Sequence, residues 1–174
     1  MRIAIDLQGL QSPGSRSRGI GRYSKEIIKA MISFYPENNY ILVGNSLLNN
    51  ISEDFFVEIK NNDNVNYFTW PSPGPIDYIS NNRAIRRIAT YLRSYAFSKL
   101  HVDLILITSF FEGFTENCLT DIDKDFIDIP VISIFYDLIP LINPEKYLNN
   151  NPDFSKFYSG KIKLLKSFDG LLAI

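Results

Sequence analysis

Short apolar stretches alternate with amphipathic stretches along the chain, and this alternation constrains the fold more than any other feature of the sequence. The apolar stretches are typical of parallel strands that are buried on both faces, while apolar residues three and four apart indicate helices. The predicted strands are residues 2–7, 40–43, 65–70, 102–108, 130–136 and 170–174. The predicted helices are residues 20–31, 53–60, 83–99 and 154–168. This order predicts an α/β fold with a doubly wound, mainly parallel, Rossmann-like sheet.

The length and charge of the chain limit the number of domains and the kinds of ligand to expect. The 174 residues are 45% hydrophobic, which is enough for one substantial core, so residues 1–174 are predicted to form a single domain. Lys and Arg number 18 against 19 Asp and Glu, so the charge balance gives no reason to expect binding to nucleic acid.

The number of cysteines and the first residues of the chain indicate in which cellular compartment the protein is expected. Cys118 is the single cysteine, which excludes an internal disulfide and a thiolate zinc site and fits a reducing environment. Met1 leads directly into a short apolar stretch that contains Asp6, too short and too polar for a signal peptide. The sequence therefore predicts a cytoplasmic location and no metal site.

The first candidate site is the loop after the first predicted strand, which contains Arg18, Gly19, Gly21 and Arg22. Glycines let the backbone approach a ligand, and the amides at the start of the following helix favour a phosphate. The spacing resembles a dinucleotide fingerprint, but no acidic residue follows the second strand to hold a ribose, so a nicotinamide cofactor is disfavoured. The loop is either an anion site or a flexible turn with solvated arginines.

Two further candidate sites follow the fourth and fifth predicted strands. Glu112 and Gly113 lie among aromatic residues, whose rings could cover the apolar face of a sugar while Glu112 accepts hydrogen bonds from hydroxyl groups. Simple packing of these rings under the loop is the commoner alternative. Tyr136 and Asp137 end the fifth strand, where Asp137 either caps the next turn or binds a ligand hydroxyl.

The predicted helix of residues 83–99 is basic and carries no acidic residue. Its cations are Arg83, Arg86, Arg87, Arg93 and Lys99. Basic amphipathic helices can lie on anionic membranes, which would bring the protein to the inner face of the membrane. The commoner alternative is a helix that packs on the sheet with its charges in water.

Several motifs occur together and in a fixed order. They are Met1 to Gly9, Arg18-Gly19-Ile20-Gly21-Arg22-Tyr23, Ser109-Phe110-Phe111-Glu112-Gly113-Phe114, and Tyr136-Asp137-Leu138-Ile139-Pro140-Leu141 with Pro144 and Tyr147. In this order they resemble family-four retaining glycosyltransferases, and most of all the bacterial mannosyltransferases of O-antigen and polysaccharide assembly. The matches extend over nearly the whole chain.

The resemblance implies a GT-B architecture, in which a first Rossmann-like domain grips the acceptor and a second grips the nucleotide sugar. Residues 1–174 would be the N-terminal, acceptor-side domain, without the C-terminal donor domain. The Gly19 and Gly21 loop would approach the donor, and Glu112, Tyr136 and Asp137 would line the cleft. Many family members carry His-Asp where this chain has Tyr136-Asp137, so a contact that imidazole usually makes would fall to a phenol or be lost.

The family's paired glutamates, separated by seven residues, belong to the second domain, and no two glutamates here have that spacing. The isolated chain is therefore expected to be an incomplete enzyme, with its catalytic residues elsewhere. The resemblance implies transfer of a sugar, with GDP-mannose as one donor, to a glycan acceptor with retention of configuration and without a cofactor or metal. A non-catalytic nucleotide- or sugar-binding Rossmann module that scaffolds a partner is the alternative.

Overall fold

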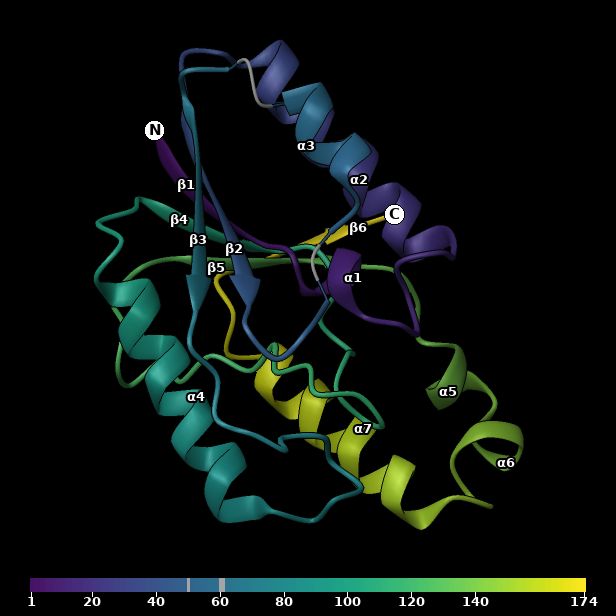
Figure 1. The fold of residues 1–174 in the computed structure, drawn as a ribbon. Coiled ribbons are helices and arrows are strands. Elements are labelled where there is room, and N and C mark those ends of the chain that lie inside the picture. The colour runs from purple at the N-terminus through teal and green to yellow at the C-terminus, as the bar shows by residue number, and fades with distance from the viewer. Residues whose placement is uncertain (50, 60–61) are drawn as a thin grey trace.

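The computed structural model describes residues 1–49, 51–59 and 62–174 and contains one parallel sheet with helices on both faces (Figure 1). The strands are β1 (Arg2–Asp6), β2 (Asn39–Asn45), β3 (Val65–Trp70), β4 (Leu104–Ile107), β5 (Val131–Phe135) and β6 (Gly170–Ala173). The longer helices are α2 (Gly19–Phe34), α3 (Glu53–Ile59), α4 (Arg83–Ser98) and α7 (Pro152–Leu165). Each lies within a few residues of its predicted position, except that Lys60, the predicted end of α3, lies outside the described residues.

The strand order is β3-β2-β1-β4-β5-β6, and every neighbouring pair is parallel. The chain builds one half of the sheet outward from β1 and then crosses to β4 to build the other half. This order confirms the prediction of a doubly wound, Rossmann-like sheet. In such sheets ligands bind outside the carboxyl ends of the strands, at the point between β1 and β4 where the order reverses.

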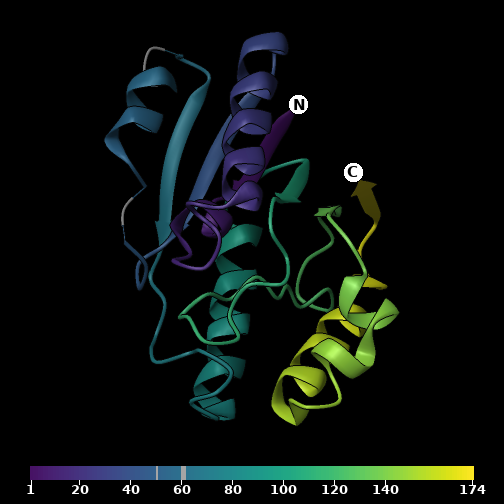
Figure 2. The same ribbon diagram turned by 90° about the vertical axis from the view of Figure 1, so that its right-hand side faces the viewer.

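The two faces of the sheet have separate cores. Helices α2 and α3 cover one face with Ile28 and Phe55, and α4 and α7 cover the other, where Phe97 is buried (Figures 1 and 2). The neighbouring β1 residues Ala4 and Ile5 are both 0% exposed and belong to opposite cores. Burial on both faces explains why the strands show continuous apolar runs rather than alternation with polar residues.

Three helices of four residues were not expected from the sequence. They are α1 (Gln8–Gln11), α5 (Ile139–Ile142) and α6 (Pro144–Tyr147). A single turn is too short to show a helical period, so no pattern of apolar residues marks it. Helix α1 lies directly after β1, and α5 and α6 lie between β5 and α7, so all three shape the loops at the carboxyl ends of the strands.

The helix predicted for residues 83–99 is confirmed as α4, but the expectation of a basic face in water or on a membrane is wrong for two of its arginines. Arg93 is fully buried, with Nη2 2.5 Å from the Asp6 Oδ2 atom. Arg86 donates hydrogen bonds to the Ile76 carbonyl oxygen at 2.7 Å and to Asp121 Oδ2 at 3.2 Å. These cations neutralise buried groups in the protein and cannot face lipid at the same time.

No helix among the described residues is long and apolar enough to cross a bilayer.

Candidate functional site

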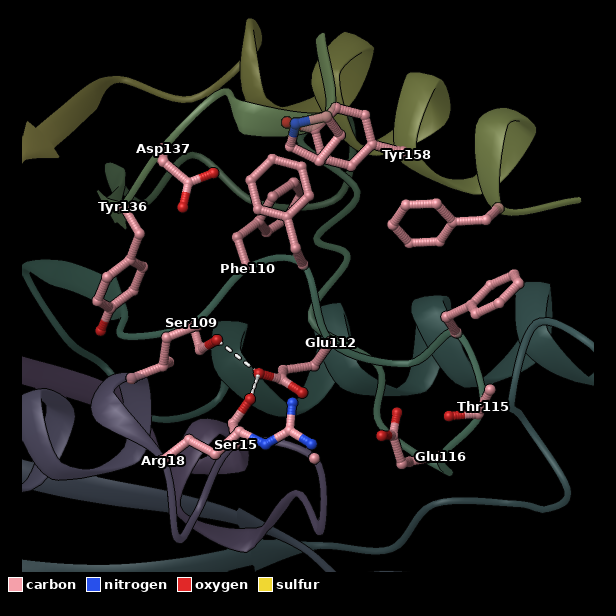
Figure 3. Close-up of a pocket in the computed structure, with 16 residues that line it drawn as sticks. Ser15, Arg18, Ser109, Phe110, Glu112, Thr115, Glu116, Tyr136, Asp137 and Tyr158 are labelled. Carbon is pink, nitrogen blue, oxygen red and sulfur yellow. Dashed lines mark hydrogen bonds between the residues drawn. The ribbon is translucent and has the colours of Figure 1, made fainter. Parts of the chain in front are cut away.

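A pocket of about 320 Å³ opens where the loops after β1, β4 and β5 meet the start of α7 (Figure 3). Its volume is near the lower end of the ~300–1,000 Å³ that is usual for ligand pockets. It lies at the carboxyl ends of the strands that flank the reversal of strand order, where the fold places ligands. Of the residues predicted from the sequence, Arg18, Glu112, Tyr136 and Asp137 line this pocket.

Glu112 is the most firmly held of these residues. Its Oε1 atom accepts hydrogen bonds from the Ser109 hydroxyl at 2.7 Å and from the Ser15 hydroxyl (Figure 3). Its Oε2 atom accepts one from the Ser12 hydroxyl at 2.7 Å. The residue is 7% exposed, and no ion pair to it occurs among the described residues. Three of roughly four acceptor positions of the carboxylate are occupied, so Oε2 keeps one position for a further donor.

Tyr136 is fixed against the end of β4. Its hydroxyl donates to the Thr108 carbonyl oxygen at 3.0 Å and lies 3.2 Å from the Ser24 hydroxyl, while its ring packs edge-on against Tyr23 at a centroid distance of 5.9 Å. Burial raises the pKa of Tyr136, so the phenol is neutral near pH 7. These contacts hold the Tyr136 ring, which lines the pocket, in one orientation.

Asp137 caps the turn after β5 and also lies in the lining of the pocket. Its Oδ1 atom accepts a hydrogen bond from the Ile139 backbone amide at 3.0 Å, which stabilises the turn into α5. The side chain is exposed and lines the pocket (Figure 3), so Oδ2 remains available to a ligand. Asp137 is therefore a capping residue that still presents a carboxylate oxygen to the site.

The remaining predicted residues lie outside the lining of this pocket. A Cβ atom on Gly21 would come within 2.5 Å of the Ser15 carbonyl oxygen, so this glycine allows the start of α2 to pack on the preceding loop. Gly113 has a φ of +96°, and a Cβ there would overlap the Cys118 carbonyl oxygen. Both glycines are explained by backbone packing. Gly19, in contrast, has open space around it. Arg22 lines a different pocket, which is described below.

The aromatic wall of the pocket comes from the loop after β4 and from α7. Phe157 is buried beside the pocket, whereas Phe154 and Tyr158 line it, and the Tyr158 ring stacks on Phe111 with centroids 4.9 Å apart. Burial raises the pKa of Tyr158, with a further contribution from the Asp137 carboxylate. The spacing of Phe154 and Tyr158, four residues apart on one helix face, was the signal that could have identified this wall.

A buried ionic cluster joins α7 to the loop after β4, and the sequence analysis missed it. The Lys161 ammonium donates to Asp121 Oδ1 at 2.6 Å and to the Thr120 hydroxyl at 2.7 Å, and it lies 4.5 Å from the Phe110 ring centroid. Burial lowers the pKa of Lys161 to about 8. Burial alone would raise the pKa of Asp121. The nearby cations Lys161 and Arg86 outweigh this effect and lower the pKa to about 2. The cluster fixes the two walls of the pocket relative to each other.

Comparison with known proteins supports the resemblance to glycosyltransferases. The chain is 29% identical over 178 residues to a serotype-specific mannosyltransferase WbdA of Escherichia coli, a match that covers 100% of this chain and 21% of the relative. Two further WbdA sequences of the same species match at 31% identity over 93 residues and at 30% over 108 residues, covering 53% and 62% of this chain. These two matches cover 11% and 13% of the relatives.

The chain thus spans about a fifth of the length of the curated relatives it matches. No known protein family profile matches the chain. No solved structure matches it either.

Proposed function

We propose that this chain is the N-terminal, acceptor-side domain of a family-four retaining glycosyltransferase of GT-B architecture. The whole enzyme would transfer a sugar from a nucleotide sugar, with GDP-mannose as the first donor to test, to a polysaccharide or lipid-linked glycan in the cytoplasm. The observation that carries this proposal is the similarity to the mannosyltransferase WbdA along the entire chain. The Rossmann-like sheet, with a pocket at the reversal of strand order, supports it.

The charge of the pocket favours a neutral sugar over a phosphate. Three carboxylates line it, from Glu112, Glu116 and Asp137, against the single guanidinium of Arg18. A phosphate placed beside these carboxylates would be repelled, whereas sugar hydroxyls can donate hydrogen bonds to them. We therefore assign the pocket to the glycan acceptor and expect the donor nucleotide to bind mainly on a second domain.

The geometry suggests how an acceptor sugar would be held. Glu112 Oε2 and Asp137 Oδ2 would accept hydrogen bonds from two sugar hydroxyls, and Arg18 could donate from the loop before α2. The ring of Phe154, which lines the pocket, would cover an apolar sugar face. Because Glu112 is locked by three serine hydroxyls, an acceptor bound to it would be presented in one orientation, which is the contribution of this domain to catalysis.

Binding experiments on the 174-residue chain test this assignment. A mannose oligosaccharide and GDP-mannose would be titrated into the ¹⁵N-labelled protein while amide shifts are followed by NMR. We expect the oligosaccharide to shift the amides of Ser109 to Glu112 and of Asp137, and we expect no saturable effect of GDP-mannose on these amides. Saturation of the same amides by GDP-mannose alone would contradict the assignment to the acceptor.

A further inference from the structure

A second pocket of about 390 Å³ lies on the other side of the loop that precedes α2. It opens between α1, the first turns of α2 and the start of α3, on the sheet face that these helices cover. It shares no lining residue with the carboxylate-rich pocket. The arginines of this region are divided between the two pockets, since Arg18 lines the first while Arg16 in the loop and Arg22 in the first turn of α2 line the second.

The charges of the second pocket are opposite to those of the first. Its lining contains three cations, from Arg16, Arg22 and Lys25, and no acidic residue. Arg16 and Arg22 are exposed, and no ion pair involves them among the described residues. Lys25 lies 3.4 Å from Glu58 Oε1, but Glu58 also pairs with Lys29, so its single negative charge is shared. A net positive pocket remains.

The surroundings strengthen this positive potential. The floor of the pocket is formed by Leu10, Ile51 and Phe55, which are 7%, 7% and 0% exposed, so one side of the cations borders on apolar core. Helix α2 has 16 residues, and it begins without a side-chain cap and without an acidic residue in its first turn. Glu53 and Asp54 begin the neighbouring α3 but do not line the pocket.

We propose that this second pocket binds the phosphate group of a phosphate-bearing ligand. Two guanidinium groups and an ammonium around one cavity match the charge and the planar, bidentate hydrogen bonding that phosphate oxygens accept. The Ser17 and Ser52 hydroxyls at the same cavity are further donors. The loop before α2 thereby separates a carboxylate site for neutral hydroxyl compounds from a cationic site for phosphate. This inference does not depend on the proposed glycosyltransferase activity.

A phosphate titration of the ¹⁵N-labelled chain tests the proposal, with chloride added to hold the ionic strength constant. We expect saturable shifts of the Ser17, Gly21 and Ser52 amides. The double substitution Arg16→Gln with Arg22→Gln should weaken binding by about tenfold or more, because two charge-assisted contacts are lost. Both arginines are exposed, so the variant should fold like the wild type. Lys156→Gln, which removes an exposed cation from α7, is the matched control and should bind phosphate normally.

GMP and farnesyl phosphate, titrated in the same way, distinguish a nucleotide from a lipid phosphate as the source. Either should bind with the same dependence on Arg16 and Arg22, and the one that binds more tightly than inorganic phosphate identifies the organic part of the ligand. Asp137→Asn, which changes the carboxylate-rich pocket without touching the loop before α2, should leave phosphate binding unchanged, so failure of the sugar site and failure of the phosphate site are separable. Shifts that chloride reproduces, or equal phosphate affinity in the double variant, would overturn the proposal.

Discussion

Replacing Lys161 with Met should destabilise the protein by breaking the buried ion pair between Lys161 and Asp121. Lys161 is 3% exposed and contacts Asp121 at 2.6 Å. Removing one partner of a buried pair costs about 3–5 kcal/mol when the other charge is left alone. Asp121 keeps Arg86 at 3.2 Å and its side chain is 21% exposed, so we expect a smaller loss of about 2–3 kcal/mol. For a domain of this size that loss lowers Tm by roughly 4–12 °C.

The pH dependence gives the same substitution a second readout. The pKa of Lys161 is about 8 in the folded protein, against 10.5 for an unperturbed lysine. Between these values the unfolded chain binds more protons, so this lysine makes the wild type more stable as pH rises, by up to about 1.4 kcal/mol per pH unit. Below pH 8 both states are protonated and the effect is constant. Lys161→Met should lack this rise.

Urea denaturation of both proteins at several pH values between 7 and 9.5 measures these effects. Lys163→Met is the matched control, because Lys163 is an exposed cation on the same helix, and it should change stability by less than about 0.5 kcal/mol. A Lys161→Met protein as stable as the wild type, with the same dependence on pH, would refute the account of the buried cluster.

Two further predictions concern the pocket and the turn beside it. Glu112→Gln replaces an acceptor of three serine hydroxyls by an amide, so we expect the affinity for a mannose oligosaccharide to fall by about tenfold, measured by isothermal titration calorimetry. Unchanged affinity would remove Glu112 from the site. Gly113→Ala should cost about 2 kcal/mol or more in urea denaturation because of its positive φ and its contact with Cys118, whereas Gly19→Ala, with open space around it, should cost little. Equal losses in the two variants would contradict the backbone argument.

The sheet could be predicted from the sequence because its strands are buried on both faces. Such strands appear in the sequence as continuous apolar runs between amphipathic helices. The residues that follow the strands could be predicted to lie close together, because the carboxyl ends of parallel strands meet at one edge of the sheet. Glu112, Tyr136 and Asp137 accordingly come together around one pocket, as expected. Single-turn helices such as α1 are too short to show a helical repeat of apolar residues, so they were not predicted.

The buried charges could not be read from helical patterns alone. Arg93 was expected to face outward because arginine is usually solvated, yet it is buried against Asp6. The sequence did contain a hint, because a carboxylate inside an apolar strand needs a buried partner. Lys161 offers a similar hint, since it interrupts the apolar stripe of α7 that contains Phe157, Tyr158 and Leu165. Which cation meets which carboxylate depends on how helices far apart in sequence cross the sheet.

Glycosyl transfer by the whole protein, compared with the 174-residue chain, would show whether this chain is one domain of a glycosyltransferase. Both proteins would be incubated with GDP-mannose and with other sugar nucleotides in the presence of a glycan acceptor, and the products would be identified by mass spectrometry. We expect transfer by the whole protein, with retention of anomeric configuration, and none by the chain alone. Absence of both transfer and donor binding in the whole protein would contradict it and indicate a non-catalytic sugar-binding module.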